Sequence, residues 1–397
     1  MDKKPKIRFK GFDDAWEQRK VSDLLTERNI QTPKSVEYPL MAFIQNQGVA
    51  PKGERYDRSS LVNDTENKLY KQTEYGDFIY SSNNLETGSI GLNKYGKACI
   101  SPVYSIFSPT GIADSDFIGR RFVRKDFINE MVKWRQGVIY GQWRIHESDF
   151  LKIDITVPSF PEQRKIGDLL DKLDNLITLH QRKYEKLKNV KKSMLEKMFP
   201  KNNSKFPEIR FKGFTDAWEQ RKLGDIGSVA MNKRIFKEQT TESGDVPFYK
   251  IGTFGGVADA YISNDLYDEY TKKYPHPKQG DILISASGSI GRTVEYSGRR
   301  EYFQDSNIVW LQHDDSIKNE FLKYFYEVVK WEGLEGSTIK RLYNKNILDT
   351  KILKPDTFEQ SKIGAFFSKL DNLITLHQRK CEKLKNIKKS MLEKMFV

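Results

Sequence analysis

Polar loops hold the residues of this sequence that are best suited to binding a ligand. They span residues 45–60, 81–89, 135–144, 285–292 and 335–345. Their amide, hydroxyl and guanidinium groups can bind base edges and phosphates, although loops also carry such groups simply because they lie in water. The candidate DNA-contacting residues are Gln45, Asn46, Gln47, Ser81, Asn83, Asn84, Arg135, Gln142, Arg144, Lys250, Ser285, Ser287, Ser289, Arg292, Lys340, Arg341 and Tyr343.

Two short motifs resemble catalytic sites but lack parts that those sites need. Residues 91–97 fit a phosphate-binding loop, yet Ala98 stands where a Mg²⁺-binding hydroxyl is required, and a strand-like run follows instead of a helix. Asp64, Glu66 and Lys68 have nuclease-like spacing, which is common in charged loops. The five histidines form no pair spaced for metal binding or a catalytic triad. We therefore expect no catalytic, metal or cofactor site in this chain.

The net charge favours a polyanionic partner. The 397 residues include 67 Lys and Arg against 54 Asp and Glu, which gives a formal charge of +13. Nucleic acid is the first candidate and an anionic membrane surface the second, while a lysine-rich protein without such a partner is the plain alternative. No apolar run is long enough to span a membrane, and Cys99 and Cys381 form no C-x-x-C pair. We expect a cytoplasmic protein with no membrane partner.

The chain repeats two segments. Residues 7–20 recur at 209–222 with one difference, Asp13 against Thr215. Residues 172–199 recur at 369–396 with two differences, Tyr184 against Cys381 and Val190 against Ile387. A period near 200 residues is too long for a solenoid and predicts two tandem, pseudo-two-fold-related domains.

The second repeated segment has the pattern of a long helix. From Ile166 onward, apolar residues recur in steps of three and four, and we expect residues 162–198 to form a rod of roughly 55 Å. Two helices with the same apolar stripe could pair as an antiparallel coiled coil, or each could only cap its own domain. The pairing predicts a seam made of Ile166, Leu170, Leu173, Ile177, His180, Tyr184, Leu187, Leu370, Ile374, His377, Cys381 and Leu384.

The variable regions between the repeats read as β-rich. Short β-branched and aromatic runs, such as those at 77–80, 103–107, 281–286 and 307–311, are bounded by Gly, Pro, Asn and Ser. Helical patches at 127–134 and 319–330 lie between them, so we expect an α+β fold. The boundaries that we predict are 1–158 for the first domain, 159–200 for the central helix, 201–355 for the second domain and 356–397 for the last helix.

These motifs resemble a known family. The segments IRFKGFDDAWEQRKVSDLL and PEQRKIGDLLDKLDNLI, and the doubling of both, are similar to the specificity (S) subunit of type I restriction-modification enzymes. The resemblance covers nearly the whole chain. The second copy departs from the first at FEQSKIG, where Ser361 replaces Arg164, and this affects one local surface contact.

The resemblance implies a DNA-reading scaffold that has no catalytic activity of its own. Each variable region would be a target recognition domain for one half of an asymmetric, split site in double-stranded DNA, and the coiled coil would set the spacer between the halves. Two modification subunits would methylate adenine with S-adenosylmethionine, and two restriction subunits would cleave DNA with ATP and Mg²⁺. The alternative that remains open is a stand-alone, sequence-specific DNA-binding regulator.

Overall fold

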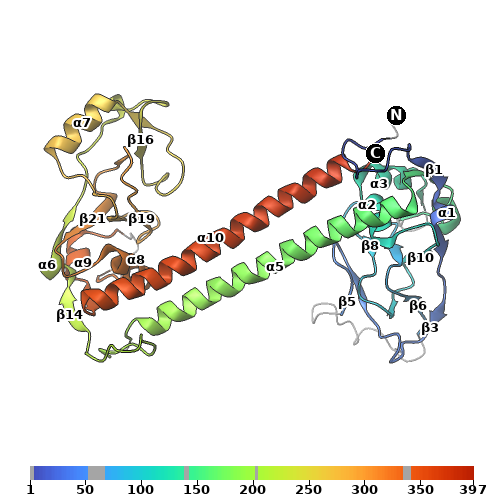
Figure 1. Cartoon of the computed structure of the whole chain (residues 1–397), viewed down its shortest axis with the longest axis horizontal. Helices are drawn as coiled ribbons and strands as arrows, with labels where there is room; N and C mark the ends of the chain where they lie inside the picture. The colour runs from blue at the N-terminus through green and yellow to red at the C-terminus, as the bar shows by residue number, and fades with distance from the viewer. Residues whose placement is uncertain (1–3, 52–67, 138–142, 202–203, 334–340) are drawn as a thin grey trace. The chain divides into compact units, whose positions relative to one another are not determined.

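The computed structural model describes residues 4–51, 68–137, 143–201, 204–333 and 341–397. The chain forms two compact units. Unit 1 contains residues 1–180 and 380–397, and unit 2 contains residues 181–379. Each long helix therefore contributes one half to each unit (Figure 1).

Unit 1 is built mainly from short antiparallel strands. Its largest sheet has the order β2-β10-β7-β8. Smaller sheets pair β1 with β13, β4 with β5, and β11 with β12, and a three-stranded sheet has β6 between β3 and β9. The strands are β1 (Glu17–Lys20), β2 (Leu25–Glu27), β3 (Gln31–Thr32), β4 (Ala42–Ile44), β5 (Gly48–Ala50), β6 (Tyr70–Thr73), β7 (Phe78–Tyr80), β8 (Ile90–Leu92), β9 (Ala98–Ile100), β10 (Ser105–Pro109), β11 (Gln136–Gly137), β12 (Trp143–Arg144) and β13 (Asp154–Val157). The helices are α1 (Val21–Leu24), α2 (Ser115–Phe122), α3 (Lys125–Val132), α4 (Glu147–Phe150) and the first half of α5 (Phe160–Met198).

Unit 2 repeats this plan. Its four-stranded sheet has the order β15-β21-β18-β19, β14 pairs with β22, and β16 lies between β17 and β20. The strands are β14 (Glu219–Lys222), β15 (Gly227–Ala230), β16 (Val246–Tyr249), β17 (Tyr261–Ile262), β18 (Ile282–Ser285), β19 (Thr293–Glu295), β20 (Tyr302–Phe303), β21 (Ile308–His313) and β22 (Lys351–Lys354). The helices are α6 (Leu223–Ile226), the 3₁₀ turn η4 (Lys237–Gln239), α7 (Asn264–Lys273), α8 (Asn319–Val328), α9 (Asn344–Asp349) and the first half of α10 (Thr357–Lys394).

The central strand of each large sheet is buried on both faces. In β7, Phe78 and Tyr80 join one hydrophobic cluster while Ile79 joins another. In β18, Ile282 and Ile284 likewise face one cluster and Leu283 faces a second. Because successive side chains of a strand point to opposite faces, a continuous apolar run is what such a strand requires. The runs that predicted strands at 77–80 and 281–286 form these two strands.

A buried ion pair joins the first repeated segment to the start of each long helix. Arg8 donates to both carboxylate oxygens of Glu162 at 2.7 and 2.8 Å, and Arg210 does the same to Glu359 at 2.8 and 2.7 Å. Both glutamates are 1% exposed in their side chains. Two parallel, charge-assisted hydrogen bonds fix orientation as well as distance. The pair explains why this Arg and this Glu recur in both copies.

The glutamine that follows each of these glutamates binds the backbone around the helix start. Gln163 accepts a hydrogen bond from the N–H of Asp114 at 3.0 Å and donates to the carbonyls of Ile112 and Pro158. Gln360 makes the same set of bonds to Lys318, Ser316 and Pro355. Both side chains are buried, so these bonds satisfy polar groups that water cannot reach. The repeated Glu-Gln pair therefore has a structural role in both units.

Each unit is completed by the end of the long helix that begins in the other unit. Trp16 packs edge-to-face on Phe396 of unit 1 at a centroid distance of 6.4 Å, and Trp218 packs in the same way on Phe199 of unit 2 at 6.0 Å. The backbone N–H of Ile7 also donates to the carbonyl of Lys394. In unit 2, the backbone N–H of Ile209 makes the equivalent hydrogen bond to the carbonyl of Lys197. Both tryptophans are 1% exposed. The second repeated segment is thus part of the core of each unit.

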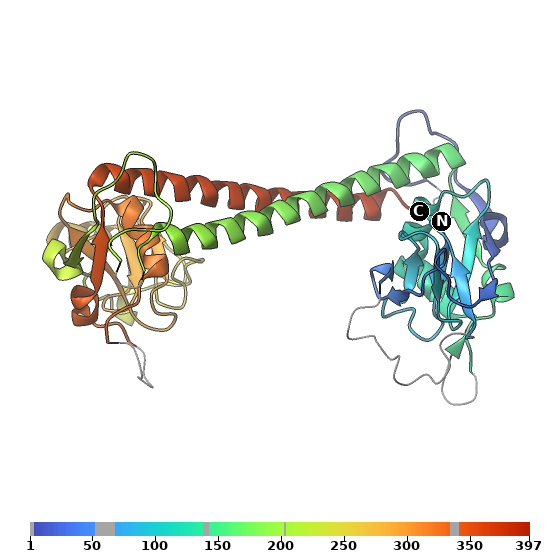
Figure 2. The same ribbon diagram turned by 90° about the horizontal axis from the view of Figure 1, so that it is seen from below.

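The two long helices pair in antiparallel fashion. In unit 1, Lys388 of α10 binds Asp174 of α5 at 2.5 Å, and in unit 2, Lys191 of α5 binds Asp371 of α10 at 2.8 Å. Lys388 and Asp371 are the repeat copies of Lys191 and Asp174, so one contact is made twice, reciprocally. The first half of each helix contacts the second half of the other (Figures 1 and 2). The predicted α+β class with two tandem domains and an antiparallel coiled coil is confirmed.

The residues of the predicted seam are less exposed than their apolar neighbours. Leu176, Leu179, Leu373 and Leu376 lie off the seam and are 42–45% exposed. The buried members of the predicted seam are Ile166, Leu170, Leu173, Leu370 and Cys381. The partly buried members are Ile177, His180, Tyr184, Leu187, Ile374, His377 and Leu384. Within the described residues, no helix is both long and apolar enough to cross a membrane.

A histidine is enclosed by aromatic rings in unit 2. Nε2 of His276 lies 3.2 Å from the hydroxyl of Tyr267 and 3.1 Å from that of Tyr296, and the Tyr302 ring stacks on the imidazole. Burial lowers the pKa of His276 to about 4. The folded unit therefore holds this imidazole neutral at a pH where an unfolded chain would protonate it.

We expect the pair Arg8–Glu162 to be required for the stability of unit 1. Arg8→Ala should lower the free energy of unfolding by about 3–5 kcal/mol, because it leaves a buried carboxylate without its partner. Urea denaturation would measure the loss. The control is Arg19→Ala, which removes an exposed pair with Glu17 and should cost less than about 1 kcal/mol. Equal effects of the two substitutions would contradict the prediction.

We expect His276 to make unit 2 less stable in mild acid. An unfolded histidine binds a proton as the pH falls below about 6.5, whereas folded His276 stays neutral until the pH nears 4, so stability is lost across that window. The loss from this residue should reach about 2 kcal/mol at pH 5. Thermal unfolding at pH 7 and pH 5 would detect it. His276→Gln should reduce the difference, and an unchanged difference in His276→Gln would refute this origin.

Candidate nucleic-acid interface

The loop after the central strand of each large sheet gathers many of the predicted contact residues. In unit 1 it spans residues 81–89, and in unit 2 it spans residues 286–292. Ser81 donates its N–H to the carbonyl of Ser89, which closes the first loop. Ser285 donates its hydroxyl to the carbonyl of Ser289 and accepts from the N–H of Arg292, which closes the second. Ser81 and Ser285 are 6% and 1% exposed, so burial assigns these two predicted contact residues to shaping the loops.

An arginine stands beside this loop at the same place in both units. Arg144 precedes the buried Ile145, whose N–H donates to the hydroxyl of Ser82 at 3.0 Å. Arg341 precedes the buried Leu342, whose N–H donates to the carbonyl of Ala286 at 2.8 Å. In each unit a short helix follows, α4 or α9. The structure thus places Arg144 and Arg341 at equivalent positions, which the sequences of the two loops do not reveal.

The side chains of Arg144 and Arg341 make different contacts. The Arg144 side chain is 58% exposed and lies 3.8 Å from the Glu147 carboxylate. Arg341 donates to the carbonyl of Ser306 at 3.2 Å, and its guanidinium lies over the ring of Tyr343, which is 62% exposed. An exposed guanidinium keeps donors free for a base edge or a phosphate.

A second loop in unit 1, at residues 45–47, packs against the loop at residues 81–89. Asn46 has a φ of 60° and donates its N–H to the carbonyl of Gly88, while Gln45 donates its amide to the Thr87 hydroxyl at 3.2 Å. Gly88 has a φ of 99°, and a Cβ there would lie 2.3 Å from the amide oxygen of Asn46. Only glycine fits this approach. Gln47 is exposed at the tip of the same turn.

The corresponding loop of unit 2 approaches in a similar way. It carries Lys250, whose amine pairs with Asp259 at 2.9 Å, and Ile251, which lies 3.6 Å from the position that a Cβ of Gly288 would take. Ser287 donates its hydroxyl to Asn307 at 2.8 Å. Ser289 and Arg292 are exposed. Among the described residues, the structure therefore groups the predicted contact residues of each unit around one loop.

Three predicted contact residues of unit 1 form hydrogen bonds that hold the loop. Arg135 donates to both carboxylate oxygens of Glu86 at 2.7 and 2.6 Å, and these hydrogen bonds lower the pKa of Glu86. Asn83 accepts the N–H of Trp143 at 2.5 Å, and Asn84 accepts the Thr87 hydroxyl at its carbonyl. Gln142 and Lys340 lie outside the described residues. The exposed Trp143 was not among the predicted residues, because a tryptophan in a short polar hairpin has no distinctive sequence signal.

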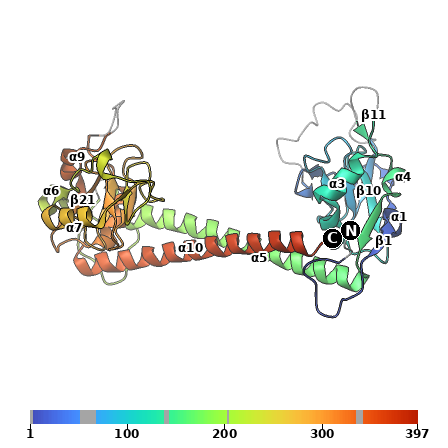
Figure 3. The same cartoon turned by 90° about the horizontal axis from the view of Figure 1, so that it is seen from above.

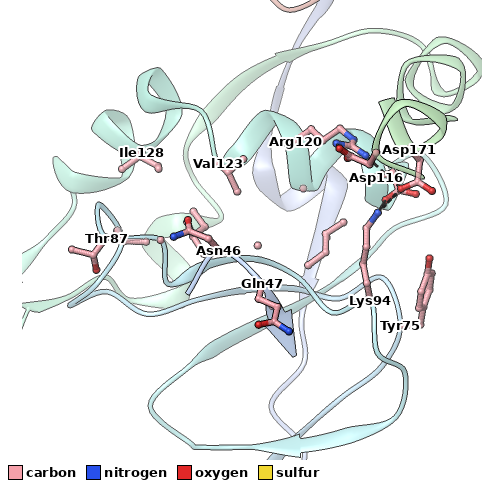
Figure 4. Close-up of a pocket in the computed structure, with 18 of the residues that line it drawn as sticks. Asn46, Gln47, Tyr75, Thr87, Lys94, Asp116, Arg120, Val123, Ile128 and Asp171 are labelled. Atoms are coloured by element: carbon pink, nitrogen blue, oxygen red, sulfur yellow. Dashed lines mark hydrogen bonds and ion pairs between the residues drawn. The ribbon is translucent and has the colours of Figure 1, made fainter. Parts of the chain in front are cut away.

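A hollow of about 780 Å³ lies in unit 1 between the turn at Asn46 and the helices α2 and α5 (Figure 4). Lys94 binds Asp116 at 2.8 Å and Asp171 at 2.6 Å, as Figure 4 shows, and Arg120 binds Asp174 at 2.8 Å. Burial opposes ionisation of Asp174, but its hydrogen bonds from Lys388 and Arg120 prevail and lower its pKa. The lining includes more acidic than basic side chains. Its charge suits a joint between domain and helix better than a site for phosphates.

The motifs that resemble catalytic sites have simple structural contexts. Residues 93–97 join β8 to β9, and Lys97 forms an ion pair with Glu37. A phosphate-binding loop would instead lead into a helix. Asp64 and Glu66 lie outside the described residues. Among the residues that are described, no group of His, Cys, Asp and Glu side chains could hold a metal ion.

Comparison with known proteins identifies the family. The sequence profile of the type I restriction modification DNA specificity domain matches residues 14–189 and again residues 215–386. The chain belongs to this family, with one copy of the domain in each repeat.

Individual relatives agree with this assignment. A protein of Haemophilus influenzae named as a type I restriction enzyme specificity subunit is 56% identical over 152 residues, which cover 38% of this chain and 40% of that protein. The MjaVIII specificity subunit of Methanocaldococcus jannaschii is 24% identical over 261 residues, or 61% of each chain. The matched part thus spans less than two thirds of either relative. The crystal structure of an S subunit from M. genitalium has the same fold, with a TM-score of 0.60 over 99% of both chains at 15% identity.

Proposed function

We propose that this chain is the DNA specificity subunit of a type I restriction-modification complex and that each unit reads one half of a split DNA site. The observation that carries the proposal is the duplicated arrangement of a closed loop with an arginine beside it, at Arg144 and at Arg341. The scaffold is the same in both units, whereas the side chains around it differ. Similar scaffolds with different reading residues suit two half-sites of different sequence.

The long helices would set the spacer between the half-sites. A helix of 39 residues is roughly 58 Å long at about 1.5 Å per residue. Half-sites one DNA turn apart are separated by roughly 34–36 Å, so a rod of this size is long enough. Reciprocal ion pairs between α5 and α10 support a fixed register of the two helices.

The partners would be two modification subunits and, for restriction, two restriction subunits. Exposed residues that recur in both units, among them Gln18 and Gln220, offer two copies of the same surface to two identical partners. The chain itself would be non-catalytic and act in the cytoplasm. S-adenosylmethionine, ATP and Mg²⁺ would belong to the partner subunits.

The test is to express the chain with a modification subunit and to map adenine methylation on the genomic DNA by single-molecule sequencing. We expect modified adenines in a single split motif with a fixed gap, and none in cells that lack this chain. Methylation without a split motif would refute the proposal. Failure to bind any modification subunit, combined with tight sequence-specific DNA binding by the chain alone, would favour the stand-alone regulator.

We expect the two arginines to affect different halves of the motif. Arg144→Ala should relax or weaken recognition of one half-site by about 10–100-fold, and Arg341→Ala should do so at the other, since a good arginine–base contact contributes about 1–3 kcal/mol. Methylation of substrates with single-base changes in each half would measure this. Arg221→Ala, at an exposed pair with Glu219, is the control. Equal weakening of both halves by either substitution would contradict modular reading.

A further inference from the structure

Trp143 is the most exposed tryptophan among the described residues. Trp16, Trp218 and Trp310 are each 1% exposed and belong to cores, whereas Trp143 is 51% exposed. It lies on β12 beside the exposed Arg144, in a hairpin with β11. Exposing so much apolar ring to water is unfavourable, which makes its position informative.

The surrounding structure holds Trp143 in place. Its backbone N–H donates to the Asn83 amide oxygen at 2.5 Å, and Ile145, two residues further on, is buried. Across the hairpin, Trp143 pairs with Gly137, and a ring carbon lies 4.0 Å from the position that a Cβ of Gly137 would take. One side of the ring therefore lies near a residue with no side chain, and half of the tryptophan remains open to solvent.

The neighbourhood of Trp143 favours a nucleic acid over a protein partner. Arg144, Asn83 and Gln136 around it are polar or charged and exposed. A protein interface centres on a contiguous apolar patch, whereas a single aromatic ring among basic and amide side chains is typical of surfaces on which bases stack. A two-stranded β-ribbon also fits the major groove of B-DNA. Figure 3 shows β11 on the side of unit 1 that faces away from α5.

We propose that Trp143 stacks on a base of the half-site that unit 1 reads, at a step where the duplex is opened. This inference rests on the proposed function and adds a contact to it. Side chains that enter a base step unstack it and bend the duplex, and adenine methylation requires a base to leave the stack. In the sequence, Lys340 precedes Arg341 where Trp143 precedes Arg144, so the two arginines have different neighbours.

The test uses the full chain in complex with its modification subunit and a duplex that carries the motif found by methylation mapping. Trp143→Ala should weaken binding by about 10–100-fold, in line with the loss of one stacked base, and Trp143→Phe should recover most of it. Because stacking is not ionic, the slope of affinity against salt should stay unchanged. Trp134→Ala is the matched control, since Trp134 is 38% exposed but follows α3.

A second readout locates the contact. Duplexes with 5-iodouracil at successive positions should crosslink to Trp143 at one position of one half-site, and Trp143→Ala should abolish that crosslink. Thermal unfolding and binding of the modification subunit should match the wild type. If Trp143→Ala binds DNA with wild-type affinity, the inference fails but the proposed function stands. If Trp143→Ala instead loses binding of the modification subunit, Trp143 is a protein contact and the inference fails in the same way. Absence of sequence-specific binding by the wild-type complex overturns the proposed function as well.

Discussion

The buried pair between an arginine of the first repeated segment and a glutamate in the first turn of a long helix is the contact on which both units depend. Arg8–Glu162 and Arg210–Glu359 carry full charges in places where water barely reaches. Desolvating two charges is costly, and only the two-pronged geometry with its short hydrogen bonds offsets that cost. A pair of this kind tolerates little change in either partner. It therefore constrains both repeated segments at once, in both copies.

The same constraint extends from the helix starts to the helix ends. Phe396, near the end of α10, lies in the core of unit 1, and Phe199, just beyond α5, lies in that of unit 2. Each domain thus consists of its own variable strands, its own opening segment and pieces of both long helices. Because the two helix pieces pack in equivalent cores, nearly the same sequence is needed in both. The exposed side chains of the loops that follow the central strands do not pack in these cores, so they can differ.

Much of the architecture could be predicted from the sequence because its determinants are local. The helices have a continuous 3.6-residue pattern, and the central strands are short apolar runs with turn residues at both ends. The equivalence of Arg144 and Arg341 could not be predicted, because it depends on how Ile145 and Leu342 dock onto distant loops. Nor could the use of Arg135 to hold Glu86 be predicted, since the two residues lie 49 positions apart in the chain. The role of Gly88 is likewise set by Asn46, which lies 42 positions earlier.

The composition of unit 1 has a consequence for how the protein is made. Its core needs Met395 and Phe396 as well as Trp16, so it joins residues separated by almost the whole chain. Unit 2 consists of the single stretch 181–379 and has all its parts earlier during synthesis. Contacts of large sequence separation form slowly, and unfinished cores expose apolar surface. During translation the second unit can therefore fold first. The core of the first unit stays incomplete, with Trp16 exposed to solvent, until the end of α10 has been synthesised.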